Sequence, residues 1–395
     1  MAPKTSPGPS SVLRGHRTDV QALCYHPKKD LLYSGDADGE AKLWDLTTER
    51  ALWSQRLHAT HAGITALHFV TCNHSTLLSQ GRDGAIKQWD VSAEGTLSRV
   101  PLQVIETGSY NFCRMAVYVP EGPATNLLHQ QASPSSPEDM SDNSHAEAIK
   151  PQHKIDALAA MSDMANCNQL RTELASSICS EEDTTVETAN AALVAIAGHD
   201  PAVLELWNLQ TGAPMKQLHQ PEGVKHGMCM AVQLFNQPAR HTLYALVGYE
   251  DGEVAVWDVF QGNLLISKHL HDEPVMAVAI DATGEGGICA AADNKVHCFS
   301  LDLPAQQVTL KATLEVKQQG IADICIRQDQ RLFATAGWDG KIRVFHYKKL
   351  KTLAVLQYHK KGLTALVLDS RAQRLVSASR DGNIALWSVF QSDSI

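Results

Sequence analysis

Three sets of residues in this chain combine a serine, a histidine and an aspartate, the side chains that form the catalytic triad of serine hydrolases. In each set the histidine precedes the serine, and the aspartate follows the serine by four residues. A tryptophan six residues after the aspartate adds an indole N–H donor. The sets are His16, Ser34, Asp38 and Trp44; His61, Ser79, Asp83 and Trp89; and His359, Ser377, Asp381 and Trp387.

The repetition of these sets argues against catalysis. A hydrolase needs one nucleophile, whereas the same combination returns several times along this chain. A buried imidazole between strands also needs a carboxylate partner simply to satisfy its hydrogen-bonding groups. We therefore interpret the sets as structural tetrads that brace the fold, and we expect no catalytic residue.

Other motifs that carry chemistry are missing from the sequence. It contains no GxSxG, no HExxH, no phosphate-binding GxxxxGK[ST] and no paired Cys/His spacing typical of a metal site. The glycine-rich stretch 284–287 joins two expected strands and opens no helix, so it is interpreted as a turn. The sequence thus predicts a protein that is not an enzyme and that binds no cofactor and no metal.

The tetrads belong to a longer repeated pattern. Small residues precede Asp-Gly or Asp-Asn, and a short alternating strand then ends at an aromatic residue. Asp-Gly supplies the positive-φ residue that a tight hairpin turn requires. Copies lie at 34–46, 79–91, 247–259, 335–347 and 377–389, with a weaker copy at 289–301 and a degenerate one at 195–209. Four short strands in each of seven repeats predict an all-β, seven-bladed WD-repeat β-propeller.

The two ends of the pattern predict how the ring closes. After each of the other copies comes one further strand, but the last copy has none. The residues from Ser10 to Arg14 precede the first repeat and have no other partner. We expect this N-terminal strand to pair with the open edge of the last blade and close the ring.

The pattern lapses between residues 120 and 189, where Pro, Ser, Asp and Glu dominate. Residues 133–190 hold eleven acidic and three basic residues, most of the net charge of −9. We expect disorder in this insertion, which is either a regulatory or partner-docking segment or a tolerated surface insertion. The predicted layout is a disordered 1–9, blades one, two and the start of three in 10–119, the acidic Ser/Pro-rich insertion in 120–189, and the remaining blades in 190–391.

Composition limits the partners and the compartment. Outside the insertion the charges nearly balance, which argues against direct nucleic-acid binding. The first ten residues contain no apolar core for a signal peptide, and no apolar run is long enough to span a membrane. The nine cysteines show no CxxC spacing, and most lie in apolar stretches. We expect a reduced, intracellular protein without a membrane partner.

Several segments are similar to one family of WD-repeat proteins. Residues 248–259, 271–281, 320–327, 334–347 and 353–366 resemble the family of guanine-nucleotide-binding protein β-subunit-like protein 1, the animal counterpart of fungal ASTRA-associated protein 1. The resemblance implies a cytoplasmic and nuclear scaffold. Its implied protein partners are co-chaperone complex subunits and phosphatidylinositol-3-kinase-related kinases, whose maturation and stability it would support, and with them DNA-damage signalling.

The sequence also bears on two other roles known for this fold, in a G protein and in a ubiquitin ligase. A G-protein γ subunit is not an expected partner, because the residues before the first strand are rich in Pro, Ser and Gly and contain no heptads. The alternative is a substrate receptor of a cullin-type ubiquitin ligase, a common use of this fold. Such receptors often carry WDxR at the blade end. The phrases WDLT, WDVS, WNLQ, WDVF and WSVF contain no arginine, which favours the scaffold.

The turns of the repeats predict a partner-binding rim. If each turn aspartate faces inward to its histidine, the residue just before it points outward. An exposed tryptophan among charged residues is typical of an interface anchor, so Trp338 is the leading candidate; packing of Trp338 into a neighbouring blade is the alternative. The candidate rim comprises Trp338, Arg82, Glu250 and Arg380, with His271 and Glu273 on a connecting loop of the same rim.

Overall fold

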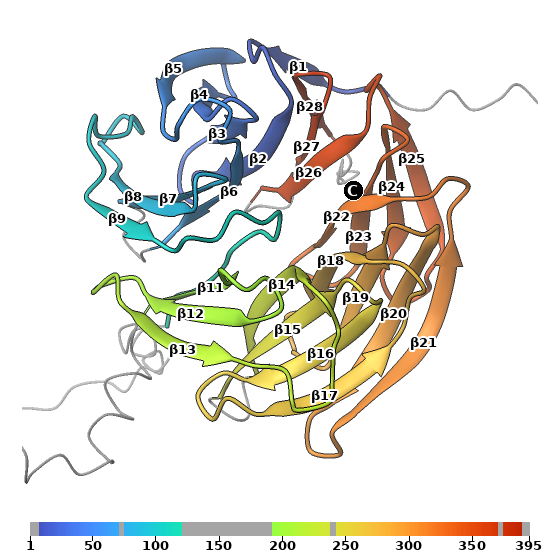
Figure 1. Cartoon of the computed structure of the whole chain (residues 1–395). Coiled ribbons are helices and arrows are strands. Elements are labelled where there is room, and N and C mark those ends of the chain that lie inside the picture. Colours follow the sequence, from blue (N-terminus) through green and yellow to red (C-terminus); the bar gives the residue numbers. More distant parts are fainter. Residues whose placement is uncertain (1–7, 71–74, 121–191, 238–241, 370–373, 389–395) are drawn as a thin grey trace, which may run out of the picture. The chain divides into compact units, whose positions relative to one another are not determined.

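The computed structural model of the chain describes residues 8–70, 75–120, 192–237, 242–369 and 374–388. These residues form strands and connecting turns, which assemble into seven antiparallel sheets of four strands. In six sheets the strands pair in chain order, as expected when short turns join antiparallel neighbours. The prediction of an all-β, seven-bladed propeller is confirmed (Figure 1).

Each sheet is one blade. Blade one consists of β2 (Val20–Tyr25), β3 (Leu31–Asp36), β4 (Glu40–Asp45) and β5 (Arg50–Arg56). Blade two consists of β6 (Ile64–Phe69), β7 (Thr76–Gly81), β8 (Ala85–Asp90) and β9 (Gln103–Glu106). Blade three consists of β10 (Ala116–Tyr118), β11 (Leu193–Ala197), β12 (Leu204–Asn208) and β13 (Pro214–Leu218). Blade four consists of β14 (Cys229–Asn236), β15 (Leu243–Tyr249), β16 (Glu253–Asp258) and β17 (Leu264–His269).

The remaining three blades follow the same plan. Blade five consists of β18 (Val275–Ile280), β19 (Gly286–Ala291), β20 (Lys295–Asp302) and β21 (Gln307–Glu315). Blade six consists of β22 (Ile321–Ile326), β23 (Leu332–Gly337), β24 (Lys341–His346) and β25 (Thr352–Gln357). Blade seven consists of β26 (Leu363–Leu368), β27 (Leu375–Ser379), β28 (Asn383–Trp387) and β1 (Ser11–Arg14).

The apolar core lies in layers between neighbouring blades. Tyr33 and Leu43 of blade one, for example, pack with Ile64 and Leu77 of blade two. Equivalent clusters lie between most other neighbours around the ring. Because a middle strand such as β15 is covered on both faces, it is buried along its whole length. Each blade is therefore stabilised chiefly by the blades beside it, as in other repeat proteins.

The ring is closed within blade seven. Strand β1 pairs antiparallel with β28, from Ser11 opposite Leu386 to Arg14 opposite Asn383. The side chain of Leu13 is 1% exposed and belongs to the core layer between blades seven and one. The predicted closure by the N-terminal strand is confirmed, and β1 and β28 lie side by side in Figure 1 although they come from opposite ends of the sequence.

The Asp-Gly turns and the loops that enter the next blade lie on the same face of the ring. Gly39 has a φ of +79°, and a Cβ there would lie 2.8 Å from the carbonyl oxygen of His58. The backbone N–H groups of Leu57 and His58 both donate to the carbonyl oxygen of Gly39. Only glycine fits this conformation and this close approach. We call the side of the ring that carries these turns the turn face.

Two predicted segments fall outside the described residues. These are most of the 1–9 segment and nearly all of the 120–189 insertion, which lies between β10 and β11 of blade three. Their expected disorder therefore stays a prediction. In the parts of the chain that are described, there is no helix of the length and apolarity that crossing a bilayer requires.

The closure predicts an unusual sensitivity to truncation. Deletion of residues 1–14 removes β1 and the buried Leu13, and it is expected to lower the free energy of unfolding by at least about 3 kcal/mol. Deletion of residues 1–9 retains β1 and serves as the matched control. Urea denaturation compares the two truncations; equal unfolding midpoints would contradict the closure.

Candidate functional site

The tetrads are chains of hydrogen bonds that hold a loop to the blade that it enters. In blade seven, Trp387 Nε1 donates to Ser377 Oγ at 3.0 Å, and Ser377 Oγ lies 2.9 Å from His359 Nε2. On its other side, His359 Nδ1 lies 3.2 Å from Asp381 Oδ2. Asp381 also accepts the backbone N–H groups of Lys360, from the loop, and of Asn383, from the turn. These four tetrad residues are the ones that the sequence pattern predicts.

In blade one the predicted aspartate is wrong. His16 Nδ1 lies 2.8 Å from Asp36 Oδ2, while His16 Nε2 and Trp44 Nε1 both contact Ser34 Oγ. Asp36 Oδ1 accepts the backbone N–H groups of Asp38 and Glu40, each at 3.0 Å. The sequence SGDADG offers two carboxylates, and the one at the end of β3 already caps the turn. Asp38 therefore points away from His16.

In blade two the predicted histidine is wrong. His58 Nδ1 lies 2.8 Å from Asp83 Oδ1, and His58 Nε2 lies 2.8 Å from Ser79 Oγ, which also accepts Trp89 Nε1–H. His61 is instead 85% exposed in its side chain and pairs with Asp38 at 3.0 Å. The histidine and serine are 18 residues apart in blades one and seven but 21 apart here. In blade two the loop between the histidine and the first strand is two residues longer, and the hairpin that follows is one residue longer, so His61 matches the 18-residue spacing although it is not the tetrad histidine.

His271 in blade five, predicted to lie on the partner-binding rim, is buried. His271 is 1% exposed, and its Nδ1 lies 2.9 Å from Asp293 Oδ2. It is therefore the tetrad histidine of this blade and not part of an accessible rim. Its ring lies 4.3 Å from that of His297, and Phe299 stands where other blades have tryptophan. In blade five the turn aspartate and the loop histidine therefore still pair, although the serine and the indole of the tetrad are missing.

The other blades build the brace from different side chains. In blade four, His226 Nδ1 lies 2.9 Å from Asp251 Oδ2. In blade six, which has no upstream histidine, Arg343 replaces the imidazole and donates to both carboxylate oxygens of Asp339, at 3.1 and 2.6 Å. In blade three, Trp207 Nε1 donates to Glu205 Oε2 at 3.1 Å. A turn carboxylate paired with a histidine or an arginine therefore occurs in every blade except blade three, among the residues that the structure describes.

The burial of the tetrads rules out a nucleophilic role for their serines. Ser34, Ser79 and Ser377 are all 0% exposed, so no substrate reaches their hydroxyl groups. Burial also lowers the pKa of His359, despite the neighbouring carboxylate of Asp381. Burial alone would raise the pKa of Asp83, but the hydrogen bond from His58 and nearby positive charge hold it at about 2.

The buried thiols are equally unsuited to nucleophilic chemistry. Burial raises the pKa of Cys24 and of Cys113 to about 12. The reactive form of a cysteine is the thiolate, which is therefore scarce at neutral pH in both residues. They serve as small apolar side chains of the blade interior.

Potential metal ligands gather at one place among the described residues, in blade four. Ligand atoms of His226, Asp251 and Glu253 lie within 4.8 Å of one another. These side chains already satisfy one another, because His226 Nε2 and Glu253 Oε1 both contact the hydroxyl of Ser267, at 3.2 and 2.7 Å. The group therefore needs no ion to balance its hydrogen bonds.

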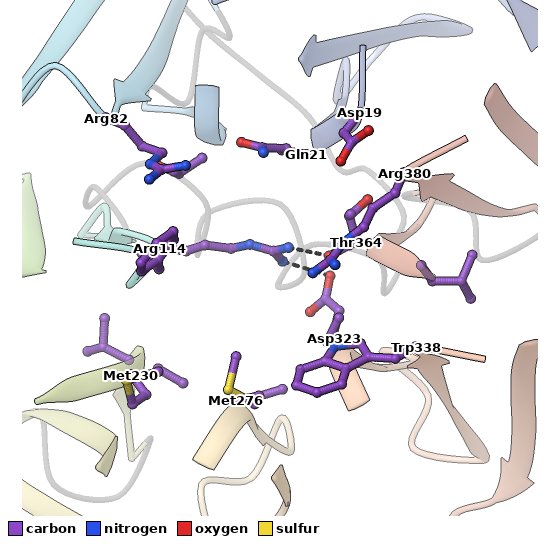
Figure 2. A pocket seen from close by; sticks show the side chains of 17 residues that line it. Asp19, Gln21, Arg82, Arg114, Met230, Met276, Asp323, Trp338, Thr364 and Arg380 are labelled. Atoms are coloured by element: carbon purple, nitrogen blue, oxygen red, sulfur yellow. Dashed lines mark hydrogen bonds and ion pairs between the residues drawn. The ribbon is translucent and has the colours of Figure 1, made fainter. Parts of the chain in front are cut away.

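The predicted rim residues Arg82, Trp338 and Arg380 do come together. They lie on the Asp-Gly turns of blades two, six and seven and line a cavity of about 380 Å³ at the centre of the turn face (Figure 2). Most of the other lining residues lie at or near the first strand of each blade, among them Asp19, Gln21, Thr65, Arg114, Met230, Met276, Asp323 and Thr364. Glu250 and Glu273 are exposed, but neither lines the cavity.

An ion pair crosses this cavity. Arg114, just before β10 of blade three, donates from Nη1 to Asp323 Oδ2 of blade six at 2.9 Å. Its Nη2 also donates to the carbonyl oxygen of Thr364 in blade seven. Asp323 Oδ2 accepts the N–H of Leu366 as well, at 2.8 Å. Three blades that are not all neighbours are thereby joined across the central opening (Figure 2).

The segment that carries Arg114 is fixed by blade two. Gln80 donates from Nε2 to the carbonyl oxygen of Cys113 and accepts the N–H of Met115 at its Oε1, at 3.1 and 2.7 Å. Phe112, in the same segment, is exposed and lies under the guanidinium of Arg82, whose Cζ is 4.4 Å from the ring centroid. This cation–π contact holds Arg82 at the cavity mouth.

Trp338 is partly exposed at the cavity mouth. Its side chain remains 39% exposed, and its ring lies flat against the backbone of Gly320, where even a Cβ would clash with it. Gly320 belongs to the loop that enters the same blade, so the alternative of burial in a neighbouring blade does not apply. A large, rigid aromatic surface held in this way is suited to anchoring a partner.

Sequence reasoning missed most of the cavity lining. Arg114 precedes a short strand, and its ionic partner Asp323 is 209 residues away, so no local pattern singles it out. Met230, Met276 and Asp323 look like ordinary residues of alternating strands. The available signal is that alternation itself: in each first strand, the residues that do not face a neighbouring blade face the central opening.

Comparison with known proteins agrees with the repeat architecture of the fold. The sequence profile described as WD domain, G-beta repeat, matches residues 8–45, 308–346 and 350–388. The chain is 29% identical to mouse guanine nucleotide-binding protein subunit beta-like protein 1 over 97% of each chain. It is 25% identical to ASTRA-associated protein 1 of Schizosaccharomyces pombe over 97% of this chain and 99% of the relative, and 24% identical to that of Verticillium alfalfae over 98% and 93%. None of these names denotes an enzyme.

The corrected tetrad of blade one can be tested with two neighbouring aspartates. Asp36→Ala leaves His16 and two turn N–H groups without their acceptor, so it is expected to lower the free energy of unfolding by about 2 to 3 kcal/mol. Asp38→Ala removes only an exposed pair with His61 and is expected to cost less than about 1 kcal/mol. Urea denaturation measures both losses. A larger loss of unfolding free energy in Asp38→Ala than in Asp36→Ala would place Asp38 in the tetrad instead.

The depressed pKa of Asp83 predicts a dependence on acid. Because its folded pKa of about 2 lies below the ordinary value of 3.8, its stabilisation is present above pH 3.8 and is lost as the pH falls toward 2. The difference in unfolding free energy between the wild type and Asp83→Asn should therefore shrink over that interval. Denaturation at a series of pH values checks this, with Asp38→Asn as control; a difference that is unchanged by acid would refute it.

Proposed function

We propose that this chain, which is a WD-repeat protein, is a non-catalytic scaffold that binds protein partners at the mouth of its central cavity. The observation that carries the proposal is the cavity, where Trp338 stays partly exposed and which Arg82 and Arg380 also line. Exposed aromatic and arginine side chains are the residue types that dominate the binding energy of protein interfaces.

The partners that we propose come from the resemblance to other proteins. The fungal relatives are named for their association with ASTRA. We infer that this chain joins a corresponding assembly of co-chaperone subunits. There it supports the maturation and stability of phosphatidylinositol-3-kinase-related kinases and, through them, DNA-damage signalling. Work in this pathway calls for a cytoplasmic and nuclear protein, a location that fluorescence microscopy of the tagged chain tests directly.

Affinity purification of the tagged full-length chain, followed by mass spectrometry, tests the proposal. The wild type is expected to recover co-chaperone subunits and kinases of this class. Trp338→Ala should reduce their recovery by roughly tenfold, the effect typical of an interface anchor, with little change in melting temperature. Leu353→Ala removes an apolar side chain that is 54% exposed on an outer strand, β25, and should leave recovery unchanged.

Three results would contradict the proposal. Recovery of cullin adaptors instead of co-chaperones would identify a ubiquitin-ligase receptor. Equal recovery by the Trp338→Ala variant would remove the cavity mouth from the interface. A large loss of melting temperature in that variant would make Trp338 a core residue.

A further inference from the structure

The charges around the central cavity do not cancel. Arg114 and Asp323 neutralise each other in their ion pair. Arg82 and Arg380 remain, both exposed, and neither forms an ion pair with any residue that the structure describes. Asp19 is the other acidic residue of the lining. The cavity mouth therefore carries more positive than negative charge, although the whole chain is acidic.

The ion pair divides the cavity into two chemically different sides. Figure 2 shows Arg114 crossing the middle, with Arg82, Gln21, Asp19 and Arg380 on one side, which keeps a net positive charge. Met230 and Met276 lie on the other side with Trp338. Methionine side chains are flexible and polarisable, and they adapt to apolar groups of different shape. One side thus suits carboxylates, and the other suits an apolar side chain.

We propose that the occupant of this cavity is an acidic segment of a protein partner, in which aspartate or glutamate side chains alternate with an aromatic or aliphatic residue. The carboxylates contact Arg82 and Arg380, and the apolar residue rests between Trp338, Met230 and Met276. This inference rests on the proposed scaffold function and specifies the chemistry of the partner at the same site.

The surroundings of Arg82 and Arg380 leave both guanidinium groups available to such a ligand. Arg82 is held by the ring of Phe112 at 4.4 Å, which reduces the side-chain freedom that binding would remove. Arg380 occupies the equivalent turn of blade seven, and blade one between them contributes only the small Ala37 at that position. The space between the two guanidinium groups is therefore not filled by a large side chain from the intervening turn.

Carboxylates fit the cavity better than phosphate groups do. Phosphate sites usually gather several unpaired arginines around one dianion. Here Arg114 is already committed to Asp323. Asp19 lines the same cavity and would repel a dianion more strongly than a single carboxylate. The occupant is accordingly taken to be an unmodified acidic segment.

A peptide array tests this chemistry with the purified full-length chain. The immobilised peptides vary in acidic fraction and in apolar residue, and they include lysine and phosphoserine counterparts. The affinity of retained peptides is then measured by fluorescence anisotropy. The double variant Arg82→Glu/Arg380→Glu is compared with Arg50→Glu/Arg99→Glu, which makes the same charge change at exposed positions outside the cavity lining.

We expect retention of peptides that combine Asp or Glu with Phe, Trp or Leu. Charge reversal at Arg82 and Arg380 should weaken their binding by roughly tenfold or more, while the control double variant binds like the wild type. Retention of lysine-rich or uncharged peptides only, equal loss in both double variants, tighter binding of phosphoserine peptides than of their glutamate counterparts, or no retention at all would each overturn the inference.

The scaffold proposal and this inference fail in different ways. Partner recovery from cells that depends on Trp338, without any binding of acidic peptides, would leave the scaffold intact and remove the acidic ligand. Binding of acidic peptides that depends on Arg82 and Arg380, without recovery of co-chaperone subunits, would support the ligand chemistry and refute the proposed assembly.

Discussion

The pairing of β1 with β28 is the contact on which the rest of the propeller depends. The core lies between blades, so a blade without a neighbour on one side exposes an apolar face. A sheet edge left open in blade seven would also present unpaired backbone groups to other chains. By joining residues 11–14 to 383–386, the chain converts a row of sheets into a ring and creates the central cavity at the same time.

The braces on the turn face hold that ring in register. In blades one, two, four, five and seven, a brace joins a tight turn to a histidine of the loop that enters the blade. In blade six, the turn carboxylate pairs instead with Arg343 of β24. The partners differ from blade to blade, as the Arg343 pair of blade six illustrates. What is retained is the physical requirement that buried polar groups find partners. The same turns carry Arg82, Trp338 and Arg380, which line the central cavity and which we propose to bind a partner.

Local turn chemistry explains why much of this fold was predictable from sequence. An Asp-Gly turn followed by an alternating strand depends on few residues, so its repetition predicted seven blades and their closure. The choice between Asp36 and Asp38, or between His58 and His61, depends on loop length and on which side chain already caps a turn. The cavity depends on which residues of seven separate strands face the centre. No local pattern reveals that Arg114 pairs with Asp323. The assignment of His271 to the rim failed because the connecting loop folds that side chain inward to its turn aspartate.

We propose that a protein partner binds the turn face at the cavity mouth. Hydrogen–deuterium exchange of the full-length chain, alone and in complex with a recovered partner, measures this most directly. We expect slower exchange of the bound chain in residues 109–115, 337–340 and 379–382, with no change in the outer strands β5, β21 and β25. Protection that is confined to those outer strands, with the turn face unchanged, would contradict the claim.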